Sequence, residues 1–126
     1  MLLRINFILL LILIPFLSAF GKPVIHFEKY EADLGQKEQA TIVSHIFEFT
    51  NKGDSVLIID RVHACCGRSA ELLSGSRINP GEKGKIKFSF STRQRVGKIV
   101  EICDVFSNDP ENEKVSLYVR VEVKGK

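Results

Sequence analysis

The sequence is poor in residues that particular folds and enzymes depend on. Its 126 residues include no tryptophan, one methionine and three cysteines. The lack of tryptophan, together with the lack of two cysteines at the spacing of antibody domains, excludes the disulfide-centred core of those domains. No His-Glu-x-x-His, Gly-x-Ser-x-Gly or glycine-rich phosphate loop occurs either. Apolar burial must therefore hold the fold together, and we expect a protein that is not an enzyme and needs no cofactor.

Neither sign of charge dominates. The 18 Lys and Arg residues face 15 Asp and Glu residues, which gives a formal net charge of +3. Such a small excess does not favour nucleic acid as a partner. The locally basic run STRQRVGK (91–98) is typical of a solvated face, with anionic glycans or lipid headgroups as the weaker alternative.

Long apolar runs are confined to the N-terminus. A single basic residue precedes an apolar stretch from Phe7 to Leu17, which small residues at Ala19 and Gly21 follow. This is the order of a secretory signal peptide, and the stretch is shorter than the ~20 residues of a membrane-spanning helix. We predict a signal peptide at residues 1–21 and export to the periplasm or beyond, with a retained anchor as the alternative. No membrane association is expected after cleavage.

The remaining residues, 22–126, can form one domain with its own core and are too few for two. Segments rich in β-branched and aromatic residues recur between turn residues, with the two-residue alternation of half-buried strands. This pattern predicts an all-β, immunoglobulin-like antiparallel β-sandwich of about seven strands. A short helical turn is expected around Ala70–Leu73. The expected strands are Val24–Phe27, Thr41–Thr50, Val56–Val62, Lys85–Ser91, Lys98–Phe106 and Lys114–Val123. The expected core is Phe27, Phe47, Phe49, Leu57, Ile59, Ile86, Phe88, Val105 and Leu117.

Six short landmarks follow one another along this domain. They are ADLG (32–35), HIFEFTNKG (45–53), LIIDRV (57–62), CGRS (66–69), INPGEKGKI (78–86) and VFSNDP (105–110). Together they resemble the bacterial domain-of-unknown-function 1573 family, whose members are usually exported and have an immunoglobulin-like fold akin to the hydin-type ASH domains. The resemblance covers Val24 to Val123. It implies the fold and the location, and it implies no established activity.

The family pattern after the third strand is a Ser-Cys-Gly-Cys-Thr run. Aligned on Gly67, Cys66 matches its first cysteine and Ser69 takes the threonine position. Cys65 takes the serine position, and Arg68 replaces the second cysteine. The resemblance therefore implies that any role of the paired cysteines in relatives is not performed in the same way here.

The stretch HACCGRS (63–69) is the one cluster of chemically versatile side chains. His63, Cys65 and Cys66 could be copper or zinc ligands, but adjacent residues of an extended chain point to opposite sides and zinc sites usually space their cysteines further apart. Arg68 and His63 could lower the pKa of Cys66 and make it a reactive thiol. A tight bend at Gly67 is the favoured interpretation.

The third cysteine, Cys103, lies in a predicted strand. A bond to Cys66 is permissible in an exported protein. We expect the strand that ends near Val62 to place Cys66 level with Lys98, about 17 Å from Cys103 at strand rise, which is too far for a disulfide. Cys103 is therefore expected to be a core residue, and an unpaired cysteine could instead link two copies of the chain.

These observations favour an exported, non-enzymatic binding or structural module. It would present loops or a sheet edge to an envelope protein or another envelope component. The loops HACCGRS (63–69) and ELLSGSR (71–77) are the expected contact surface. The alternative is a thiol-redox or metal-handling protein centred on Cys66.

Overall fold

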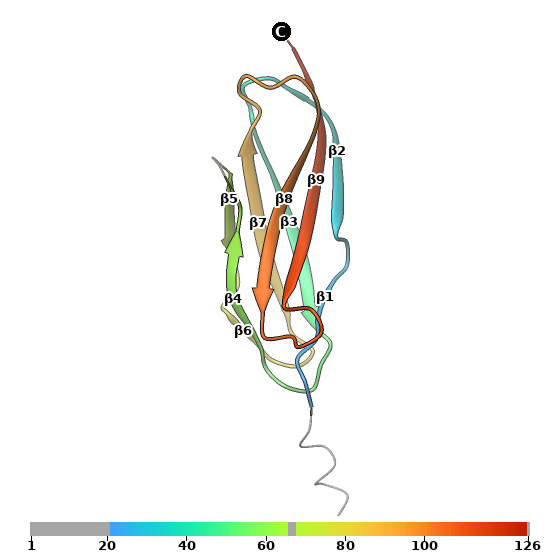
Figure 1. Ribbon diagram of the computed structural model, residues 1–126, viewed down its shortest axis with the longest axis vertical. Coiled ribbons are helices and arrows are strands. Elements are labelled where there is room, and N and C mark those ends of the chain that lie inside the picture. The colour runs from blue at the N-terminus through green and yellow to red at the C-terminus, as the bar shows by residue number, and fades with distance from the viewer. Residues whose placement is uncertain (1–20, 66–67, 126) are drawn as a thin grey trace, which may run out of the picture.

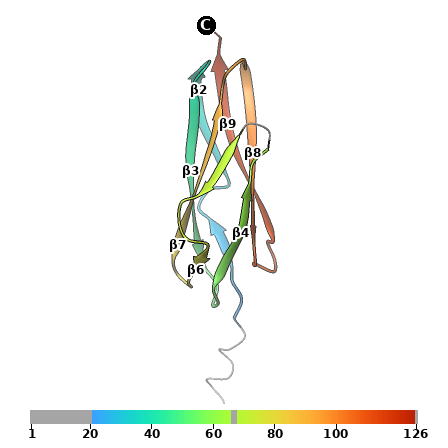
Figure 2. The same ribbon diagram turned by 90° about the vertical axis from the view of Figure 1, so that its left-hand side faces the viewer.

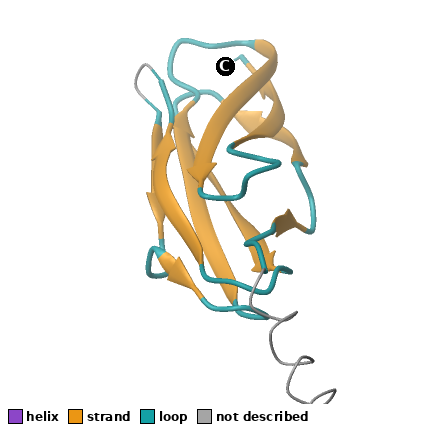
Figure 3. Cartoon of the chain, turned by 60° about the horizontal axis from the view of Figure 1, so that its bottom comes forward, coloured by secondary structure: helices purple, strands orange, loops and turns teal. Residues whose placement is uncertain are grey.

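Two β-sheets packed face to face make up the described part of the chain. The structure, a computed structural model, describes residues 21–65 and 68–125. Every regular element in these residues is a strand (Figures 1 and 3). The strands are β1 (Ile25–Phe27), β2 (Glu31–Glu38), β3 (Ile42–Asn51), β4 (Leu57–His63), β5 (Ser69–Leu72), β6 (Arg77–Ile78), β7 (Lys83–Ser91), β8 (Gly97–Ser107) and β9 (Lys114–Lys124).

The four-stranded sheet has the order β1-β3-β7-β5, and the five-stranded sheet has the order β2-β9-β8-β4-β6. The molecule is elongated along its strands (Figures 1 and 2). All neighbouring strands are antiparallel except β2 and β9, which run parallel. The predicted immunoglobulin-like sandwich is confirmed, but one pair of strands departs from the expected antiparallel arrangement.

Buried and solvent-facing residues alternate strictly along the long strands, and the buried ones form the core. In β9 every second residue from Val115 to Val123 is buried, and in β7 the same holds from Gly84 to Phe90. Each inward side chain meets the opposite sheet, which removes apolar area from water and supplies roughly 25 cal/mol per Å². All nine predicted core residues are buried, and Phe88 is 0 % exposed.

Three short or polar strands were not expected from the sequence. β5 and β6 have four and two residues, and β2 has only one buried apolar residue, Ala32. The expected helical turn around Ala70–Leu73 is wrong, because residues Ser69–Leu72 pair with Ile86–Ser89 of β7. Backbone pairing at a sheet edge, rather than side-chain alternation, defines these strands, so the count rises from about seven to nine.

The chain changes sheets between β1 and β2. β1 pairs with only the last three residues of β3, from Phe49 to Asn51. The chain then crosses to the other sheet, where β2 pairs with β9 from Glu31 onward. In the part of the chain that the structure describes, no strand lies beside the first half of β3 on that side.

Asn51, in the landmark HIFEFTNKG (45–53), supports the fold from inside. The Asn51 side chain is fully buried, its Oδ1 accepts from the N–H groups of Val24 at 3.3 Å and Gly53 at 2.9 Å, and its Nδ2 donates to the carbonyl groups of Ser55 and Ile78. One amide thus joins three segments, and every polar group it carries is satisfied.

Asp109, in the landmark VFSNDP (105–110), has the same kind of role. Asp109 is 1 % exposed and accepts from Ile25 N at 2.9 Å through Oδ2 and from Glu111 N and Asn112 N through Oδ1. Burial raises the pKa of Asp109, but these hydrogen bonds outweigh it and lower the pKa overall. The turn between β8 and β9 is thereby fastened to the start of β1.

The predicted signal peptide, residues 1–21, lies outside the described residues except for its last position. Among the described residues, no helix is long and apolar enough to cross a membrane. Cleavage and export therefore stay predictions.

Candidate functional site

The loop between β4 and β5 contains the residues that the sequence analysis singled out. His63 is the exposed last residue of β4, and Ser69 is the exposed first residue of β5. Cys65 lies on the surface between them. Cys66 and Gly67 lie outside the described residues, so the bend at Gly67 and the thiol chemistry of Cys66 stay predictions.

A buried carboxylate, which the sequence analysis missed, lies beside this loop. Glu101 of β8 has a side chain that is only 2 % exposed. Arg68 donates from Nη2 to Oε1 of Glu101 at 3.1 Å and pairs through Nε with Oε2. Arg95, from the loop between β7 and β8, pairs with Oε1. The three side chains join two loops at one end of the sandwich to a central strand.

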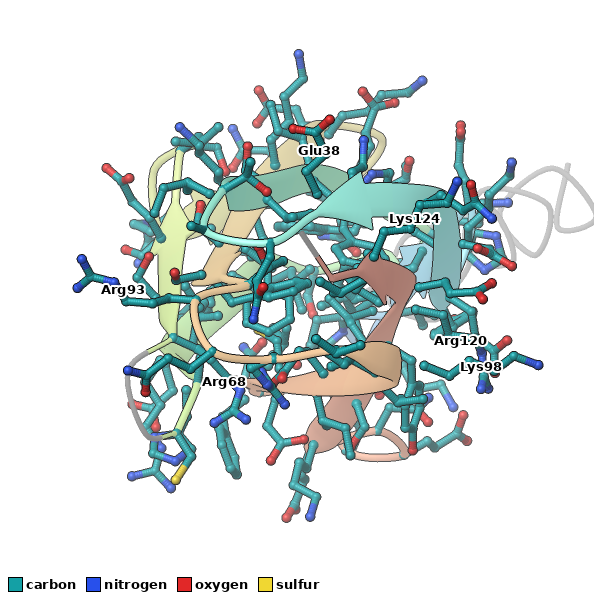
Figure 4. All side chains as sticks on the ribbon, turned by 90° about the horizontal axis from the view of Figure 1, so that it is seen from above. Glu38, Arg68, Arg93, Lys98, Arg120 and Lys124 are labelled. Carbon is teal, nitrogen blue, oxygen red and sulfur yellow. The ribbon has the colours of Figure 1, made fainter. Side chains whose placement is uncertain are left out.

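Arg68 also holds its own loop. Its backbone N–H and its Nη1 donate to the carbonyl oxygen of Cys65 at 3.3 Å and 2.9 Å. In the view from above, Arg68 lies beside β8, whereas Arg93 extends away from the molecule (Figure 4). The residue that replaces the second cysteine of the family pattern is therefore part of an ion-paired network.

This network is suited to stability rather than to proton transfer. Both carboxylate oxygens of Glu101 pair with guanidinium groups, and the side chain is buried, so a substrate in solution has little access to it. The sequence signal that could have found it is a glutamate at an inward position of β8, between Ile99 and Cys103. A charge at such a position requires a partner, because burying an unpaired charge is costly.

The cysteines are not paired across the sandwich. Cys65 is disulfide-bonded, whereas Cys103 is a free thiol that is 0 % exposed. Burial, reinforced by the negative charge of Asp104, raises the pKa of Cys103 to about 12, so the thiol stays protonated and unreactive. The prediction aligned the end of β4 with the start of β8, so that Cys66 would be level with Lys98. Cys66 lies outside the described residues, but the alignment is wrong, since β4 ends at His63 opposite Asp104, in the second half of β8.

The structure offers no metal centre in the residues it describes. Within 21–65 and 68–125, no group of three His, Cys, Asp or Glu side chains could hold a metal ion. His26 on β1 and His45 on β3 belong to one sheet, and His63 belongs to the other.

A shallow hollow of about 430 Å³ lies on the outer face of the five-stranded sheet, beside a bulge in β2 between Asp33 and Gln36. Figure 4 shows Lys98 and Arg120 near one another at this side. Arg120 is paired with Glu31 at 3.2 Å, and Lys98 is opposite Glu122 in the register of β8 and β9. Because acidic residues accompany both cations, the hollow has no excess of positive charge for an anionic ligand.

The first half of β3 has no described strand beside it on the β1 side. Ile42 is 75 % exposed and Ile46 is 49 % exposed, with exposed Ser44 between them. Beside the start of this strand, residues 36–38 of β2 and residues 41–44 line a hollow of about 470 Å³. We call the outward-facing backbone of Ile42, Ser44 and Ile46 the open edge of β3.

A comparison with protein families identifies the chain. The family described as "Protein of unknown function (DUF1573)" matches residues 25–123, which include all but the last residue of the sandwich. The chain belongs to the DUF1573 family. The resemblance inferred from the six landmarks is thus confirmed. A search of curated proteins found no match for this DUF1573 chain.

Solved structures agree on the fold. A protein of unknown function from Porphyromonas gingivalis is 18% identical with a TM-score of 0.67, over 79% of this chain and 46% of that one. The VesB protease of Vibrio cholerae is 14% identical with a TM-score of 0.63, over 80% of this chain and 32% of that one. An ASH/PapD-like domain of human CEP192 is 10% identical with a TM-score of 0.57, over 83% of this chain and 87% of that one.

At these identities the likeness shows the fold alone. The DUF1573 chain spans less than half the length of the first two proteins, so it matches one part of each. The CEP192 domain is matched over most of its length, which supports the prediction of a fold akin to ASH domains.

Proposed function

We propose that this DUF1573 chain is an exported, non-enzymatic binding module that presents a sheet edge to another protein of the envelope. The observation that carries the proposal is the open edge of β3, with its two exposed isoleucines. Unpaired N–H and C=O groups at a sheet edge bind extended segments by adding a strand, and neighbouring side chains supply specificity.

The buried polar groups support a non-enzymatic role. The buried polar residues of the described chain are Asn51, Thr92, Glu101 and Asp109. Each of them bonds to backbone or side-chain groups that hold the sandwich together. A catalytic site needs polar groups left available to a substrate, and these groups are occupied.

As the binding surface, the open edge of β3 is favoured over the two loops that the sequence analysis proposed. Arg68, the largest polar side chain of the loop HACCGRS (63–69), is engaged with Glu101 inside the molecule. In the loop ELLSGSR (71–77), part of the backbone already pairs within β5 and β6. The open edge of β3, by contrast, has backbone groups that no strand of the described chain satisfies.

Photo-crosslinking in the native envelope tests the proposal. A photo-reactive residue at position 46 should give a cross-linked product with a protein. The matched control is position 102, because Ile102 is 47 % exposed and Ile46 is 49 % exposed, but Ile102 lies on β8 of the other sheet. No product from position 46, or equal yields from both positions, would contradict binding at the edge.

A further inference from the structure

The direction of the backbone groups in β3 defines what the open edge can bind. Asn51 N bonds to Glu82 O on the β7 side, whereas Glu48 O accepts from Glu28 N and Lys52 N donates to Val24 O on the β1 side. Because these groups alternate along a strand, the odd-numbered residues face β7 and the even-numbered residues face the β1 side. The N–H and C=O groups of Ile42, Ser44 and Ile46 therefore point away from the sheet.

Among the described residues, Gly97–Cys103 of β8 also lacks a neighbouring strand on the β4 side, because β4 ends opposite Asp104. That stretch contains Lys98, and Arg68 fastens the β4–β5 loop to its Glu101.

The remaining sheet edges are protected as well. β1, β5 and β6 have three, four and two residues, so they offer little backbone. β2 has a bulge and several charged residues along EADLGQKE. Short strands, bulges and charges are the usual defences of an edge against pairing. The stretch from Ile42 to Phe47 has none of these defences: its pairing with β7 has no bulge, and none of its residues is an acid, a lysine or an arginine.

The occupant of this edge can be inferred from the order of its side chains. Two exposed isoleucines flank a central serine, so the pattern reads the same in both directions. An antiparallel copy of the edge, centred on Ser44, would place Ile42 opposite the second copy's Ile46. We propose that the open edge of β3 pairs with the same edge of a second copy of this chain. This inference rests on the proposed function and names the partner.

The register of such a pair follows from the even-numbered residues. The pairs Ile42 with Ile46, Ser44 with Ser44 and Ile46 with Ile42 would each exchange two backbone hydrogen bonds, about six in all. The two copies would be related by a twofold axis at Ser44, which is the self-complementary contact of most homodimers. On the outer face, each isoleucine would cover the isoleucine opposite it, and this removes apolar surface from water.

The surrounding chain leaves room for a strand of this length. β1 ends at Phe27, and Glu28 N bonds to Glu48 O at 3.4 Å, so the edge beyond Glu48 is already occupied. In the proposed register, Glu48 is opposite Ala40 of the second copy. Ala40 has a φ of 62°, which ends the extended conformation there. The second copy's strand would therefore begin next to the point where β1 stops.

His45, which lies within the pairing segment, does not oppose this contact at neutral pH. His45 faces inward at the edge, where burial and, secondly, the positive charge of Lys29 lower its pKa. The imidazole is therefore neutral at pH 7, and the pairing segment has no charge to repel its copy. In the proposed register the two His45 rings are diagonal neighbours, about 7 to 8 Å apart.

Sedimentation velocity of the full chain under reducing conditions tests self-pairing. Wild-type protein should show a concentration-dependent dimer, because reduction removes any dimer linked by surface cysteines. Ile46→Lys places a charge opposite Ile42 of the copy and should give a monomer at every concentration. The matched control, Ile102→Lys, changes an equally exposed isoleucine on the other sheet and should remain a dimer. Circular dichroism checks that both variants are folded.

Cysteine crosslinking then tests the register. Ser44→Cys should form a disulfide-linked dimer on oxidation, because directly opposite residues have Cα atoms about 5.5 Å apart. Ile46→Cys alone should not, because its counterpart is four residues further along, about 14 Å away. The double variant with Ile42→Cys and Ile46→Cys should link the copies twice. Each variant is compared with wild type, which reports the crosslinks of the native cysteines.

The outcomes separate this inference from the proposed function. A protein that is monomeric at every concentration, yet crosslinks from position 46 to a different envelope protein, would overturn self-pairing and leave the binding module intact. A dimer that survives Ile46→Lys, or one in which Ser44→Cys fails to crosslink, would also overturn self-pairing. A monomer without any product from position 46 would overturn both.

Discussion

Single inward-facing polar side chains hold separate parts of this sandwich together. Asp109 joins the β8–β9 turn to β1, Asn51 joins three segments, and Glu101 binds two arginines from different loops. Asn51 and Asp109 lie within family landmarks, and Arg68, which binds Glu101, lies within another. These landmarks therefore supply buried hydrogen bonds of the fold.

Glu101 should contribute most to stability among the ion-paired residues. Glu101→Gln would leave Arg68 and Arg95 facing a neutral, buried amide, and breaking a buried ion pair costs about 3 to 5 kcal/mol. The free energy of unfolding, measured by urea denaturation, should fall by about 3 kcal/mol, at the lower end of that range, because both arginines are partly exposed.

The matched control for that prediction is Glu31→Gln. Glu31 pairs with Arg120 at 3.2 Å on the surface, where such pairs contribute about 0.2 to 1 kcal/mol. Equal losses for the two variants would mean that the buried network has no special role in stability.

His45 should make stability depend on pH. Its folded-state pKa lies below the usual 6.5, so the unfolded chain binds the proton more tightly. The contribution of neutral His45 is present above pH 6.5 and is lost as the pH falls through the folded pKa. His45→Gln should therefore reduce the fall in unfolding free energy between pH 7 and pH 5, as followed by urea denaturation. An unchanged slope would contradict the assignment.

For single residues, the core positions could be predicted from the sequence, but the buried charges could not. Alternating valines and phenylalanines show directly which face is inward. Glu101 and Asp109 are buried as well, yet Arg68 and Ile25, which bind them, are distant in sequence. Only the folded chain brings those partners into reach.

Strands that alternate were predicted, whereas strands defined by pairing alone were not. β3, β7, β8 and β9 have a buried apolar residue at almost every second position. β2 follows a polar sequence and is a strand because its backbone bonds to β9. The crossing from β1 to β2 could not be foreseen for the same reason, and it is this crossing that exposes β3.

Gly84 shows that a residue in a turn-like motif can serve the packing of two strands. It lies in β7 opposite Phe49, and an added Cβ would overlap the Phe49 ring, with Cε1 at 2.7 Å. Gly84→Ala should lower the free energy of unfolding by about 1 to 3 kcal/mol through overpacking, as measured by chemical denaturation.

Gly75→Ala is the comparison for this substitution. A Cβ at Gly75 would meet no atom within 4 Å, so its effect on the unfolding free energy should be close to zero. If both alanine variants were equally stable, the close approach of Gly84 and Phe49 would not matter to the fold.

At the scale of the whole molecule, the other edges of the described sandwich are short, bulged or charged, whereas the first half of β3 has none of these features. The same switch of the chain that completes the five-stranded sheet leaves Ile42, Ser44 and Ile46 on the other sheet with outward backbone groups that no strand of the described chain pairs with. Two of these residues are exposed isoleucines. A stable sandwich with one open and apolar edge is an arrangement suited to association.

Amide hydrogen exchange resolved by residue tests this account most directly. At high protein concentration the amides of Ile42, Ser44 and Ile46 should be protected, and on dilution they should exchange rapidly. The alternate amides of Val43 and His45 bond toward β7 and should stay protected at both concentrations. Rapid exchange of the even-numbered amides at every concentration would contradict association through the open edge of β3.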